Sequence, residues 1–425
     1  MKKHFLFLLL WLGMMLIING CGTAVKTTPV DTDTTLSKGP YLIYTNNNTS
    51  MTVTWQTNRT PSSSSCTMQW GPTTNYGQQA TVFENSSAEN MHQFFYTITG
   101  LNPAQRIYYK VTAGSVSYQS SFVTAPNSSA TATTFYAFSD SQSFFYDPPE
   151  PFNSIAAAIL RDSLSGNRQT FVAGAGDFAF FGMDEDSWMN DYFNRNYPEL
   201  AKFQSLFPML GAIGNHETYH YSNLNYIIDS PNAGKLLRKY WPYSFLPDAN
   251  RSYYSFDYGP IHFCVLDQYT LLDGVSGHTF SWEAENNTGQ FAWMKQDLQN
   301  TTRPWKIVMF HEPAWTAQKA IGFYGNNQVM RDYYCPVFKQ EGVKVAVQGH
   351  LHYYSRCATE EIQYLTLGGG GSKLFDLIET DAPAFVTGES GVYHFARFDV
   401  VDNHTMQVSV INKDNEVLDS FTVNQ

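Results

Sequence analysis

This chain contains six residues whose side chains are typical metal ligands, and most of them come shortly after an apolar segment. They comprise two carboxylates, one carboxamide and three imidazoles, and in sequence order they are Asp140, Asp177, Asn215, His311, His350 and His352. Oxygen and imidazole nitrogen atoms suit divalent Zn, Mn, Fe, Co or Ni, and no cysteine belongs to the set. The apolar segments are typical of buried strands, so we expect the ligands at the carboxyl ends of strands. The pattern predicts a centre for two divalent metal ions that share one carboxylate.

The spacing within each segment supports this interpretation. A glycine stands before Asp177 and another before Asn215, and glycine permits the tight turn that a strand end requires. His350 and His352 are separated by one residue, which places both rings on one side of an extended segment. A pair of metal ions held in this way can activate water against a phosphate ester. The residues therefore favour metal-dependent hydrolysis of phosphate esters.

The composition is that of an ordered globular protein with more than one domain. The chain has 425 residues, of which 43% are hydrophobic and 16% aromatic, and this length exceeds what a single core usually organises. The formal net charge of −11 disfavours binding to a polyanion such as duplex DNA. Small phosphorylated molecules stay compatible with that charge because bound metal ions reverse the local potential. We therefore expect two domains, a small phosphorylated substrate and no nucleic acid polymer as a partner.

The N-terminus has the pattern of a bacterial export signal. Two lysines precede an apolar stretch of 14 residues at positions 5–18, which is shorter than the roughly 20 residues of a membrane span. The sequence Ile18-Asn19-Gly20-Cys21 resembles a lipobox, in which the cysteine is lipidated. We predict a signal peptide over residues 1–20, and a lipidated Cys21 with a polar tether over residues 21–37. The expected localisation is the cell envelope, through a lipid anchor in the membrane; a secreted or periplasmic protein is the alternative.

Four further cysteines follow, and they are Cys66, Cys264, Cys335 and Cys357. Their wide spacing matches no zinc-binding motif. Cys264 lies inside an apolar run and is expected to be a buried small hydrophobic residue. An oxidising compartment would permit a disulfide between Cys335 and Cys357, and the sequence leaves that pairing open.

Residues 38–126 predict an all-β domain. The segments 50–55 and 95–98 alternate apolar and polar residues, and turn-forming residues separate such segments. Leu101-Asn102-Pro103, followed by Tyr108-Tyr109-Lys110-Val111, resembles the fibronectin type III pattern around its tyrosine corner. We therefore expect a β-sandwich here, followed by a short polar linker.

Residues 132–425 alternate strand and helix patterns. Apolar strands are expected before the metal-ligand residues, and residues 155–160 have helical spacing behind Asn153 and Ser154, which are favourable N-cap residues. The last segment, 392–423, returns to strand alternation. This order predicts an α/β domain in which helices cover a sheet or a pair of sheets.

Together these segments resemble the calcineurin-like metallophosphoesterases, and among them the purple acid phosphatase family. The likeness covers most of the chain beyond the tether. It rests on the order of the ligand segments, on the fibronectin-like module, and on three further segments, which are Lys38-Gly39-Pro40-Tyr41-Leu42, Tyr253-Tyr254-Ser255-Phe256-Asp257-Tyr258-Gly259 and the glycines at 368–371. The resemblance implies a fibronectin III-like domain followed by a metallophosphoesterase domain with acid phosphatase-like phosphomonoesterase activity.

The resemblance also implies a role for each ligand. The first metal ion would be bound by Asp140, Asp177 and His352. The second would be bound by Asp177, Asn215, His311 and His350, so that Asp177 bridges the two ions. A metal-bound hydroxide would attack phosphorus in line with the leaving group. His216 would stabilise the transition state or protonate the leaving oxygen.

Two positions depart from the family pattern. Purple acid phosphatases have an iron-binding tyrosine three residues after the bridging aspartate, and this chain has Phe180 there. We therefore expect no purple chromophore and no requirement for ferric iron, and we expect Zn, Mn or Fe as the metals. Many metallophosphoesterases have a histidine where this chain has Gln142, which would ligate weakly through its carbonyl oxygen or order a metal-bound water. The first metal site is therefore expected to bind more weakly than the second.

Other residues have expected roles around the centre. Arg356 would contact a phosphate oxygen, and Tyr219 and His220 would line the substrate mouth. Glu217 is expected to orient backbone groups or His216, and Glu312 to lie behind the ligands. The glycines at 368–371 match no phosphate-binding motif and predict a tight turn beneath the centre. Surface or packing roles are expected for the remaining histidines, which include His92, His262, His278, His394 and His404.

These observations favour an extracytoplasmic, lipid-anchored hydrolase of phosphate monoesters. A phosphodiesterase that acts on nucleotides or glycerophosphodiesters is the alternative among enzymes, because the ligand set does not distinguish the two esters. A non-catalytic surface lipoprotein that binds a ligand is the alternative from another class, and the presence of every principal ligand disfavours it. No protein partner can be inferred from the sequence.

Overall fold

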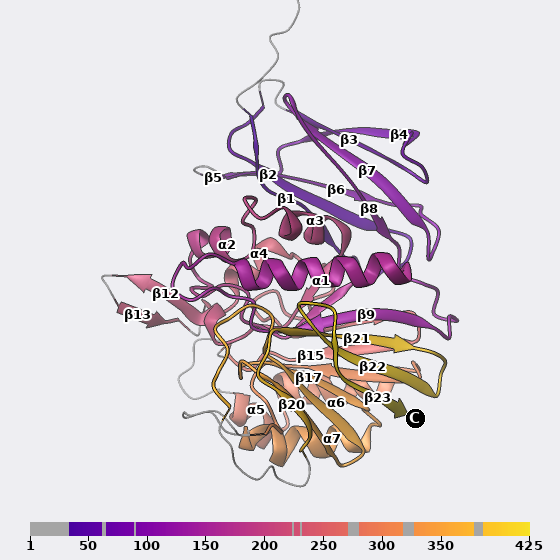
Figure 1. Ribbon diagram of the computed structural model, residues 1–425, viewed down its shortest axis with the longest axis vertical. Helices are drawn as coiled ribbons and strands as arrows, with labels where there is room; N and C mark the ends of the chain where they lie inside the picture. Colours follow the sequence, from indigo (N-terminus) through magenta and orange to yellow (C-terminus); the bar gives the residue numbers. More distant parts are fainter. Residues whose placement is uncertain are drawn as a thin grey trace, which may run out of the picture.

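The computed structural model describes residues 34–61, 65–88, 91–222, 225–229, 232–270, 280–317, 327–377 and 386–425. The predicted signal peptide, Cys21, most of the tether and His278 lie outside these residues. Within them, no helix is both long and apolar enough to cross a membrane. The chain forms an N-terminal β domain followed by an α/β domain (Figure 1), which confirms the predicted fold class.

In the described residues, the N-terminal domain is a sandwich of two four-stranded sheets with the orders β1-β2-β6-β5 and β4-β3-β7-β8. The strands are β1 (Leu36–Ile43), β2 (Met51–Thr57), β3 (Ser65–Gly71), β4 (Gln78–Phe83), β5 (Ser86–Ala88), β6 (Met91–Ile98), β7 (Arg106–Ala113) and β8 (Val116–Val123). Buried side chains from both sheets, including Trp55, Met68 and Tyr109, fill the space between them. Burial alternates along β7, as expected of a strand with one face in the core and one outside, whereas every residue of β2 is buried.

The α/β domain is built on two larger sheets. In its described part, the first has the order β11-β10-β9-β21-β22-β23 and the second has the order β14-β15-β16-β17-β19-β18-β20. The first sheet contains β9 (Thr133–Phe138), β10 (Val172–Gly174), β11 (Met209–Gly211), β21 (His394–Val400), β22 (Thr405–Asn412) and β23 (Val417–Asn424). The second contains β14 (Tyr254–Tyr258), β15 (Ile261–Val265), β16 (Trp305–Met309), β17 (Val345–Gln348), β18 (Tyr354–Thr359), β19 (Ile362–Leu367) and β20 (Val386–Ser390). Strands β9 to β11 are parallel, and so are β15, β16, β17 and β19.

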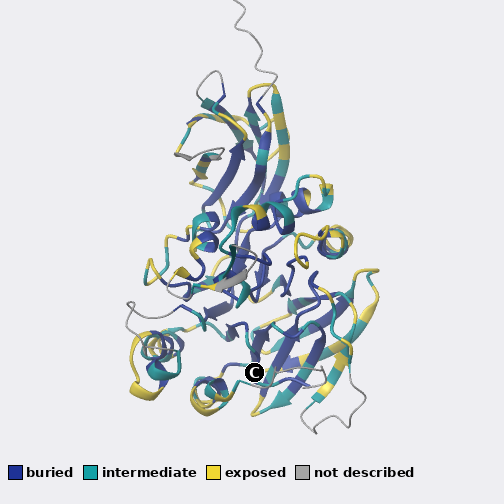
Figure 2. Cartoon of the chain, turned by 90° about the vertical axis from the view of Figure 1, so that its left-hand side faces the viewer, coloured by how far each residue is buried: buried dark blue, intermediate teal, exposed yellow. Residues whose placement is uncertain are grey.

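An aromatic core holds the two sheets together. The ring of Phe135 in β9 stacks on that of Phe398 in β21 with 4.4 Å between ring centroids. The same ring meets Phe263 of β15, in the other sheet, edge-on at 5.1 Å. Offset-stacked and edge-to-face pairs of this kind are favourable beyond the area that they bury. The sheets therefore pack face to face, and Figure 2 shows their strands as the buried centre of the domain.

The helices of the α/β domain cover the sheets from both sides. They are α1 (Glu150–Gly166), α2 (Glu185–Asp191), α3 (Pro198–Leu206), α4 (Lys235–Tyr240), α5 (Phe280–Asn286), α6 (Gly289–Asn300) and α7 (Cys335–Gln340), with the π-helical turn η3 (Met330–Tyr334) before α7. Helices α1 and α3 lie between the first sheet and the sandwich, whereas α6 and α7 lie at the far end (Figure 1). Helix α1 begins at Glu150, directly after Pro149, so the expected N-cap residues Asn153 and Ser154 lie inside the helix. Proline is well suited to the first turn of a helix because that turn needs no N–H donor there.

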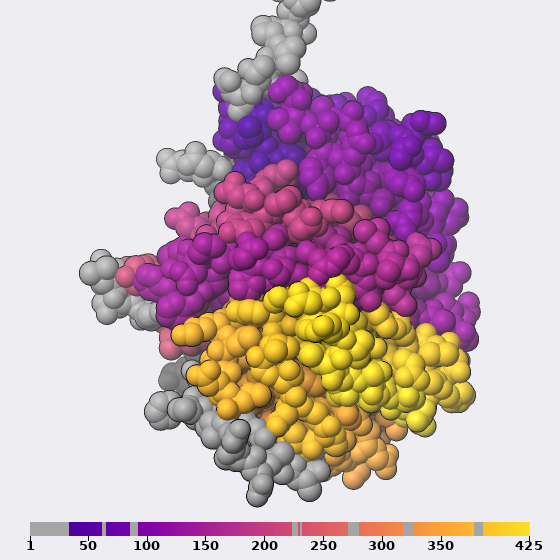
Figure 3. Space-filling model, viewed as in Figure 1, coloured from indigo at the N-terminus to yellow at the C-terminus, as the bar shows by residue number. Residues whose placement is uncertain are grey.

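The sandwich is joined to the α/β domain through buried tyrosine hydroxyls. Tyr41 donates to the carbonyl of Tyr240 at 3.1 Å, and Tyr109 donates to that of Ser205 at 2.8 Å. The two domains contribute to one continuous cluster of buried hydrophobic residues. Figure 3 shows the sandwich resting directly on the first half of the α/β domain.

The four cysteines in the described part of the chain are buried free thiols. Cys264 is buried in β15, as its apolar surroundings predicted. The sequence left open a disulfide between Cys335 and Cys357, and the structure does not contain it. Both are free and buried, and Cys357 Sγ lies 3.6 Å from the hydroxyl of Ser355.

Candidate metal centre

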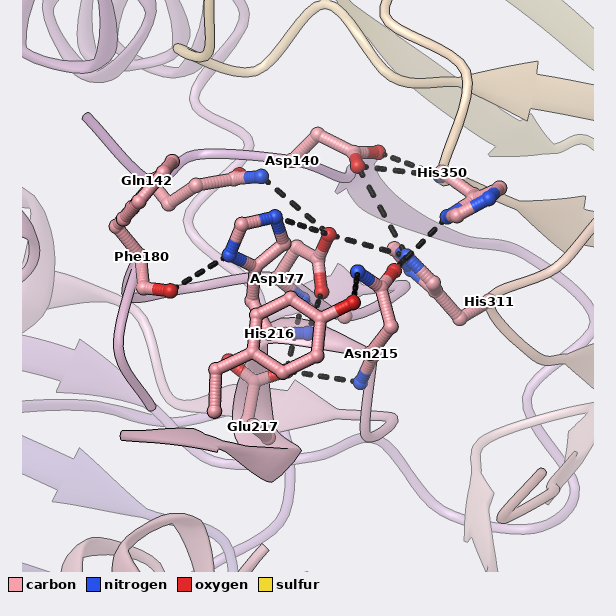
Figure 4. Close-up of polar contacts among 12 residues, drawn as sticks. Asp140, Gln142, Asp177, Phe180, Asn215, His216, Glu217, His311 and His350 are labelled. Atoms are coloured by element: carbon pink, nitrogen blue, oxygen red, sulfur yellow. Dashed lines mark hydrogen bonds and ion pairs between the residues drawn. The ribbon is translucent and has the colours of Figure 1, made fainter. Parts of the chain in front are cut away.

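The predicted ligands meet at one edge of the two sheets. Asp140, Asp177 and Asn215 follow strands β9, β10 and β11, and His311 and His350 follow β16 and β17. Because these strands are parallel within each sheet, their carboxyl ends lie together, where α/β proteins commonly bind ligands. Figure 4 shows the five side chains pointing toward one another from separate loops.

The four residues assigned to the second metal ion form one tight group. The Nε2 atom of His311 lies 3.2 Å from Asp177 Oδ2 and 3.1 Å from Asn215 Oδ1. The Nδ1 atom of His350 lies 2.8 Å from the same Asn215 oxygen. Asp177, His311 and His350 each offer a ligand atom, and these atoms lie within 4.8 Å of one another. A single ion can therefore reach all four side chains after small adjustments.

The residues assigned to the first metal ion lie beside this group. The Nε2 atom of His352 is 3.5 Å from Asp140 Oδ1, and the same carboxylate oxygen is 4.0 Å from His311 Nε2. Both Asp140 and Asp177 are almost fully buried. Asp177 contacts the His311 group through Oδ2, while its Oδ1 accepts the backbone N–H of His216 at 2.9 Å. The structure thus brings together all six residues of the predicted ligand set.

Backbone carbonyls determine which ring nitrogens face the centre. His311 Nδ1 lies 2.7 Å from the carbonyl of Ala175, and His352 Nδ1 lies 2.7 Å from that of Lys373. A carbonyl only accepts hydrogen bonds, so each Nδ1 carries a proton and donates it. In a neutral ring, Nε2 then directs its lone pair at the carboxylates, which is the orientation that a metal ligand needs.

The donor set fits a divalent cation. The unprotonated Nε2 of a neutral His311 faces two oxygen acceptors, an arrangement that is repulsive unless a positive charge lies between them. Burial alone would lower the pKa of His311, but the charges of Asp177 and Asp140 raise it to about 10. The cluster therefore stabilises positive charge strongly, and oxygen with imidazole ligands is the mixture preferred by Zn, Mn and Fe.

Several ligands have an unusual backbone conformation. Asp140, Asp177 and His350 have φ angles of 59°, 58° and 70°, in the left-handed region that non-glycine residues rarely adopt. Gly176 has a φ of 101°, so it provides the turn expected before Asp177. Gly214 is needed for space instead, because a Cβ atom there would lie 2.1 Å from Asp177 Oδ1.

Glu217 holds the loops of the centre in place. It is fully buried in the short 3-10 turn η1 (His216–Thr218). One carboxylate oxygen accepts the N–H groups of Asp177 and Gly214 at 3.0 and 2.8 Å, and the other accepts that of Phe178 at 2.9 Å. Burial and the nearby charge of Asp177 raise the pKa of Glu217 to about 7. The prediction that Glu217 orients the backbone is confirmed.

His216 lies beside the centre with one nitrogen available. Its Nδ1 lies 2.6 Å from the carbonyl of Phe180 and therefore donates to it. Its Nε2 lies 3.9 Å from Asp177 Oδ2, and the side chain is 15% exposed. The ring of Phe180 packs against the His216 ring at 4.8 Å. His216 can thus reach a substrate at the metal centre while its orientation is fixed from behind.

Gln142 approaches the bridging carboxylate through its amide nitrogen. Nε2 lies 3.3 Å from Asp177 Oδ2, and among the described residues the buried Oε1 has no hydrogen-bond partner. A buried amide oxygen without a partner is costly. The atom is consistent with the predicted contact to a metal ion or its water.

The residues expected at the mouth have different positions. Tyr219 opens the hairpin of β12 (Tyr219–Ser222) and β13 (Asn225–Ile228), and its hydroxyl accepts the amide N–H of Asn215 at 3.1 Å. This contact directs the Asn215 oxygen toward the imidazoles, so Tyr219 is a positioning residue. His220 is half-buried near the carboxylate of Asp184.

Arg356 is engaged away from the ligands. Its guanidinium pairs with Asp419 of β23, with 2.8 Å between Nε and Oδ2, and stacks over the ring of Phe421 at 4.2 Å. These contacts join β18 to β23 and leave the predicted phosphate contact of Arg356 without support. No local pattern indicates these contacts, because Asp419 lies 63 residues further along the chain.

Two further groups support the ligand loops. Gln268, which sequence reasoning missed, accepts the backbone N–H groups of His311 and Glu312 at 3.0 and 2.7 Å. Its position two residues after an apolar run was the available signal. Glu312 accepts from Tyr269 and Asn327. The glycines at 368–371 pack beneath Asp140, where a Cβ on Gly368 would lie 2.0 Å from the Leu351 carbonyl.

The ligands lie at one edge of two paired sheets, in an α/β domain that follows a β-sandwich in the chain. This is the architecture of a metallophosphoesterase with an added N-terminal domain. The family model described as calcineurin-like phosphoesterase matches residues 133–354, slightly more than half of the chain. The model described as the purple acid phosphatase N-terminal domain matches residues 38–124. The chain therefore belongs to the calcineurin-like phosphoesterase family.

Individual proteins show the same relationship. Purple acid phosphatase 21 of Arabidopsis thaliana is 28% identical over 213 residues, covering 47% of this chain and 43% of its own length. A purple acid phosphatase of Glycine max is 25% identical over 316 residues, covering 73% of this chain and 61% of its own length. The structure of a purple acid phosphatase from seeds of yellow lupin (Lupinus luteus) superposes with a TM-score of 0.70 at 16% identity, over 91% of this chain and 74% of that one. The chain thus spans between about two fifths and three fifths of the length of these curated relatives.

Proposed function

We propose that this chain is a metal-dependent hydrolase of phosphate monoesters that uses two divalent metal ions. The observation that carries the proposal is the position of His311 Nε2, which faces Asp177 Oδ2 at 3.2 Å and Asn215 Oδ1 at 3.1 Å. These atoms are largely buried, and a cation bound between them would interact favourably with all three. The names of the purple acid phosphatase relatives support the ester class.

The ligands divide between the two ions as the resemblance implies. Asp140, Asp177 and His352 would hold the first, and Asp177, Asn215, His311 and His350 would hold the second. Bound divalent ions in such a pair supply Lewis-acid activation of water and neutralise charge on the phosphoryl oxygens. The chain orients three of the ligands, Asp177, Asn215 and His311, through Glu217, Tyr219 and Gln268 respectively.

His216 supplies the proton that the reaction needs. Its Nδ1 proton is committed to the Phe180 carbonyl, so exchange with the substrate takes place at Nε2. In its protonated form, Nε2–H donates to the leaving oxygen, which departs as an alcohol rather than as an alkoxide.

Comparison of a monoester with its diester tests the ester class. The chain from residue 22 would be assayed for nitrophenol release from para-nitrophenyl phosphate and from bis(para-nitrophenyl) phosphate, with Mn, Zn or Fe and with a chelator. We expect metal-dependent release and a higher kcat/KM for the monoester.

The other outcomes are equally specific. Preference for the diester would replace the monoesterase with the phosphodiesterase alternative. If neither ester is hydrolysed although two metal ions are bound, the non-catalytic binding protein is favoured. Undiminished release in the presence of the chelator would contradict a metal-dependent reaction altogether.

We also propose that the protein is anchored to the cell envelope by a lipid on Cys21. The support is the pattern of residues 1–21 alone, with its basic start, its apolar stretch and its lipobox-like end. The full chain should fractionate with membranes, and the Cys21→Ser variant should not carry the lipid. Equal incorporation of labelled palmitate into both proteins would contradict the anchor, while a membrane-bound but unlabelled wild type would exclude lipidation.

A further inference from the structure

Three consecutive aromatic residues are exposed close to the metal centre. Phe144, Phe145 and Tyr146 are 54%, 40% and 39% exposed, and we refer to them together as the aromatic rim. They follow directly on the segment that contains Asp140 and Gln142. Exposure of three neighbouring rings is unfavourable in water unless a ligand covers them. Their position at the end of a ligand loop raises the question of which part of a substrate they meet.

The backbone holds the aromatic rim in place. Phe145 and Tyr146 have φ angles of 46° and 65°, a left-handed conformation that is costly for bulky residues. The N–H of Asp147 closes the turn onto the Phe144 carbonyl at 2.9 Å. The side chain of Asn190 then donates to the carbonyl of Asp147 at 3.0 Å. The loop is thus tied to helix α2 in a strained form that keeps the rings outward.

Other aromatic rings support the rim from below. Phe144 meets Phe180 edge-on with 5.3 Å between centroids. Phe145 meets Phe181 at 5.7 Å and Tyr221 of strand β12 at 5.3 Å. The inner edges of the rim rings are therefore packed, while their outer faces remain accessible. This arrangement is a preformed surface rather than a loose segment.

Contacts connect the aromatic rim to the reacting groups. Phe180, which supports Phe144, lies 4.8 Å from the ring of His216. His216 Nε2 in turn lies 3.9 Å from the bridging carboxylate of Asp177. The leaving oxygen of a substrate must sit beside His216, so the group attached to that oxygen extends toward Phe180 and Phe144. The rim is placed to contact the leaving group and not the phosphoryl group.

The charges around the rim disfavour an anionic leaving group. Burial, and then the charges of Asp184, Asp186 and Asp191, raise the pKa of Tyr146. These three acidic residues lie around Tyr146, so an anionic substituent placed on the rim would have carboxyl groups as neighbours. A neutral planar ring would instead form the stacked or edge-on contacts that aromatic side chains favour.

We propose that the aromatic rim selects phosphate monoesters whose leaving group carries a neutral aromatic ring. This inference rests on the proposed monoesterase function and names its substrate class. It concerns specificity alone. Phe144 and Phe145 pack on Phe180, and it is Phe180 that packs on His216.

The matched substrates are 2-phenylethyl phosphate and n-butyl phosphate. Both release a primary alcohol, so the reactivity of the phosphate ester is the same and only the ring differs. We expect the wild-type protein to prefer the phenylethyl ester in kcat/KM by about fivefold, the size of one aromatic contact. In Phe144→Ala/Phe145→Gly, this preference should fall to near unity while the rate with the butyl ester stays within about twofold. Glycine suits the left-handed backbone at position 145.

Controls separate specificity from folding. Phe83→Ala removes a ring that is even more exposed, at 66%, from strand β4 of the sandwich and should leave the preference unchanged. Phe144→Tyr should retain the preference because the ring remains. An equal preference in the wild type and in the double variant would overturn the rim as a specificity surface. Failure of the wild type to hydrolyse either ester would overturn the proposed function, whereas equal hydrolysis of both would overturn the rim alone.

Discussion

At the scale of single residues, the centre is built from strained positions. Asp140, Asp177 and His350 all have positive φ angles, and each such residue costs about 1–3 kcal/mol. Hydrogen bonds hold them there: the N–H of Asp177 is bound by Glu217, and the N–H of His350 by the Asp140 carboxylate at 2.9 Å. The strain directs side chains from three loops to one point, which an unstrained strand end would not do.

His216 should be separable from the metal ligands. In His216→Ala the backbone N–H that binds Asp177 remains, and the acceptors around His311 are untouched. We therefore expect full metal content and a kcat lowered by about 10²–10⁴, the usual contribution of a general acid. Elemental analysis and steady-state assays would be run beside the exposed control His404→Ala. Loss of metal, or an unchanged kcat, would remove His216 from the role of proton donor.

The residues of the centre that belong to short sequence patterns could be predicted. Those whose partners lie far away in the sequence could not. Asp177, Asn215 and His350 each follow a glycine, and most of the ligands come shortly after an apolar run, so a local window reveals them. Glu217 binds backbone groups about 40 residues earlier, and Gln268 binds one 43 residues later. Such contacts depend on how the strands come together, and no local pattern encodes that order.

At the scale of elements, the strands were predictable and their arrangement was not. Apolar runs indicate β9, β10, β11, β16 and β17 because buried parallel strands are apolar on both faces. The order of the sheets depends on pairs such as β21 with β9, which joins Ala396 to Ala137. The start of α1 was also missed, because Pro149 and Pro151 begin the helix before the expected N-cap residues.

A partly buried network of ion pairs ties helix α6 to the second sheet. His262 of β15 lies 2.8 Å from Asp257 of β14 and 2.9 Å from Asp297 of α6. A surface or packing role was expected for His262. The residue is in fact buried, and it pairs with two carboxylates. Burial alone would lower the pKa of His262, but the two carboxylates raise it to about 9.

This network predicts a pH-dependent stability. A folded-state pKa above the ordinary value of about 6.5 stabilises the fold fully below pH 6.5, and the contribution is lost as the pH rises through about 9. Between these values the wild type should lose about 2–3 kcal/mol of unfolding free energy. His262→Gln should lack this loss, while the exposed control His404→Gln should retain it. Urea unfolding at pH 6, 7, 8 and 9 measures how the unfolding free energy changes with pH. The same pH dependence in the wild type and in His262→Gln would contradict the stabilising role of the network.

At the scale of the whole molecule, the sandwich and the α/β domain form one packed body. Tyr41 and Tyr109 hydrogen-bond across the junction, and their rings belong to the shared hydrophobic cluster. The excess of tyrosine and phenylalanine in the sequence is thus used in the cores and at this junction. The composition predicted two ordered domains, but only the structure shows that they share a core.

The metal stoichiometry of the whole protein tests the central claim most directly. Protein stripped by a chelator would be titrated with Zn or Mn, and bound metal per chain would be measured together with hydrolysis of para-nitrophenyl phosphate. We predict two ions per chain, with full activity only after the second, and neither bound metal nor activity in Asp177→Ala. Activity without bound metal, or two ions retained by Asp177→Ala, would contradict a dinuclear centre bridged by that carboxylate.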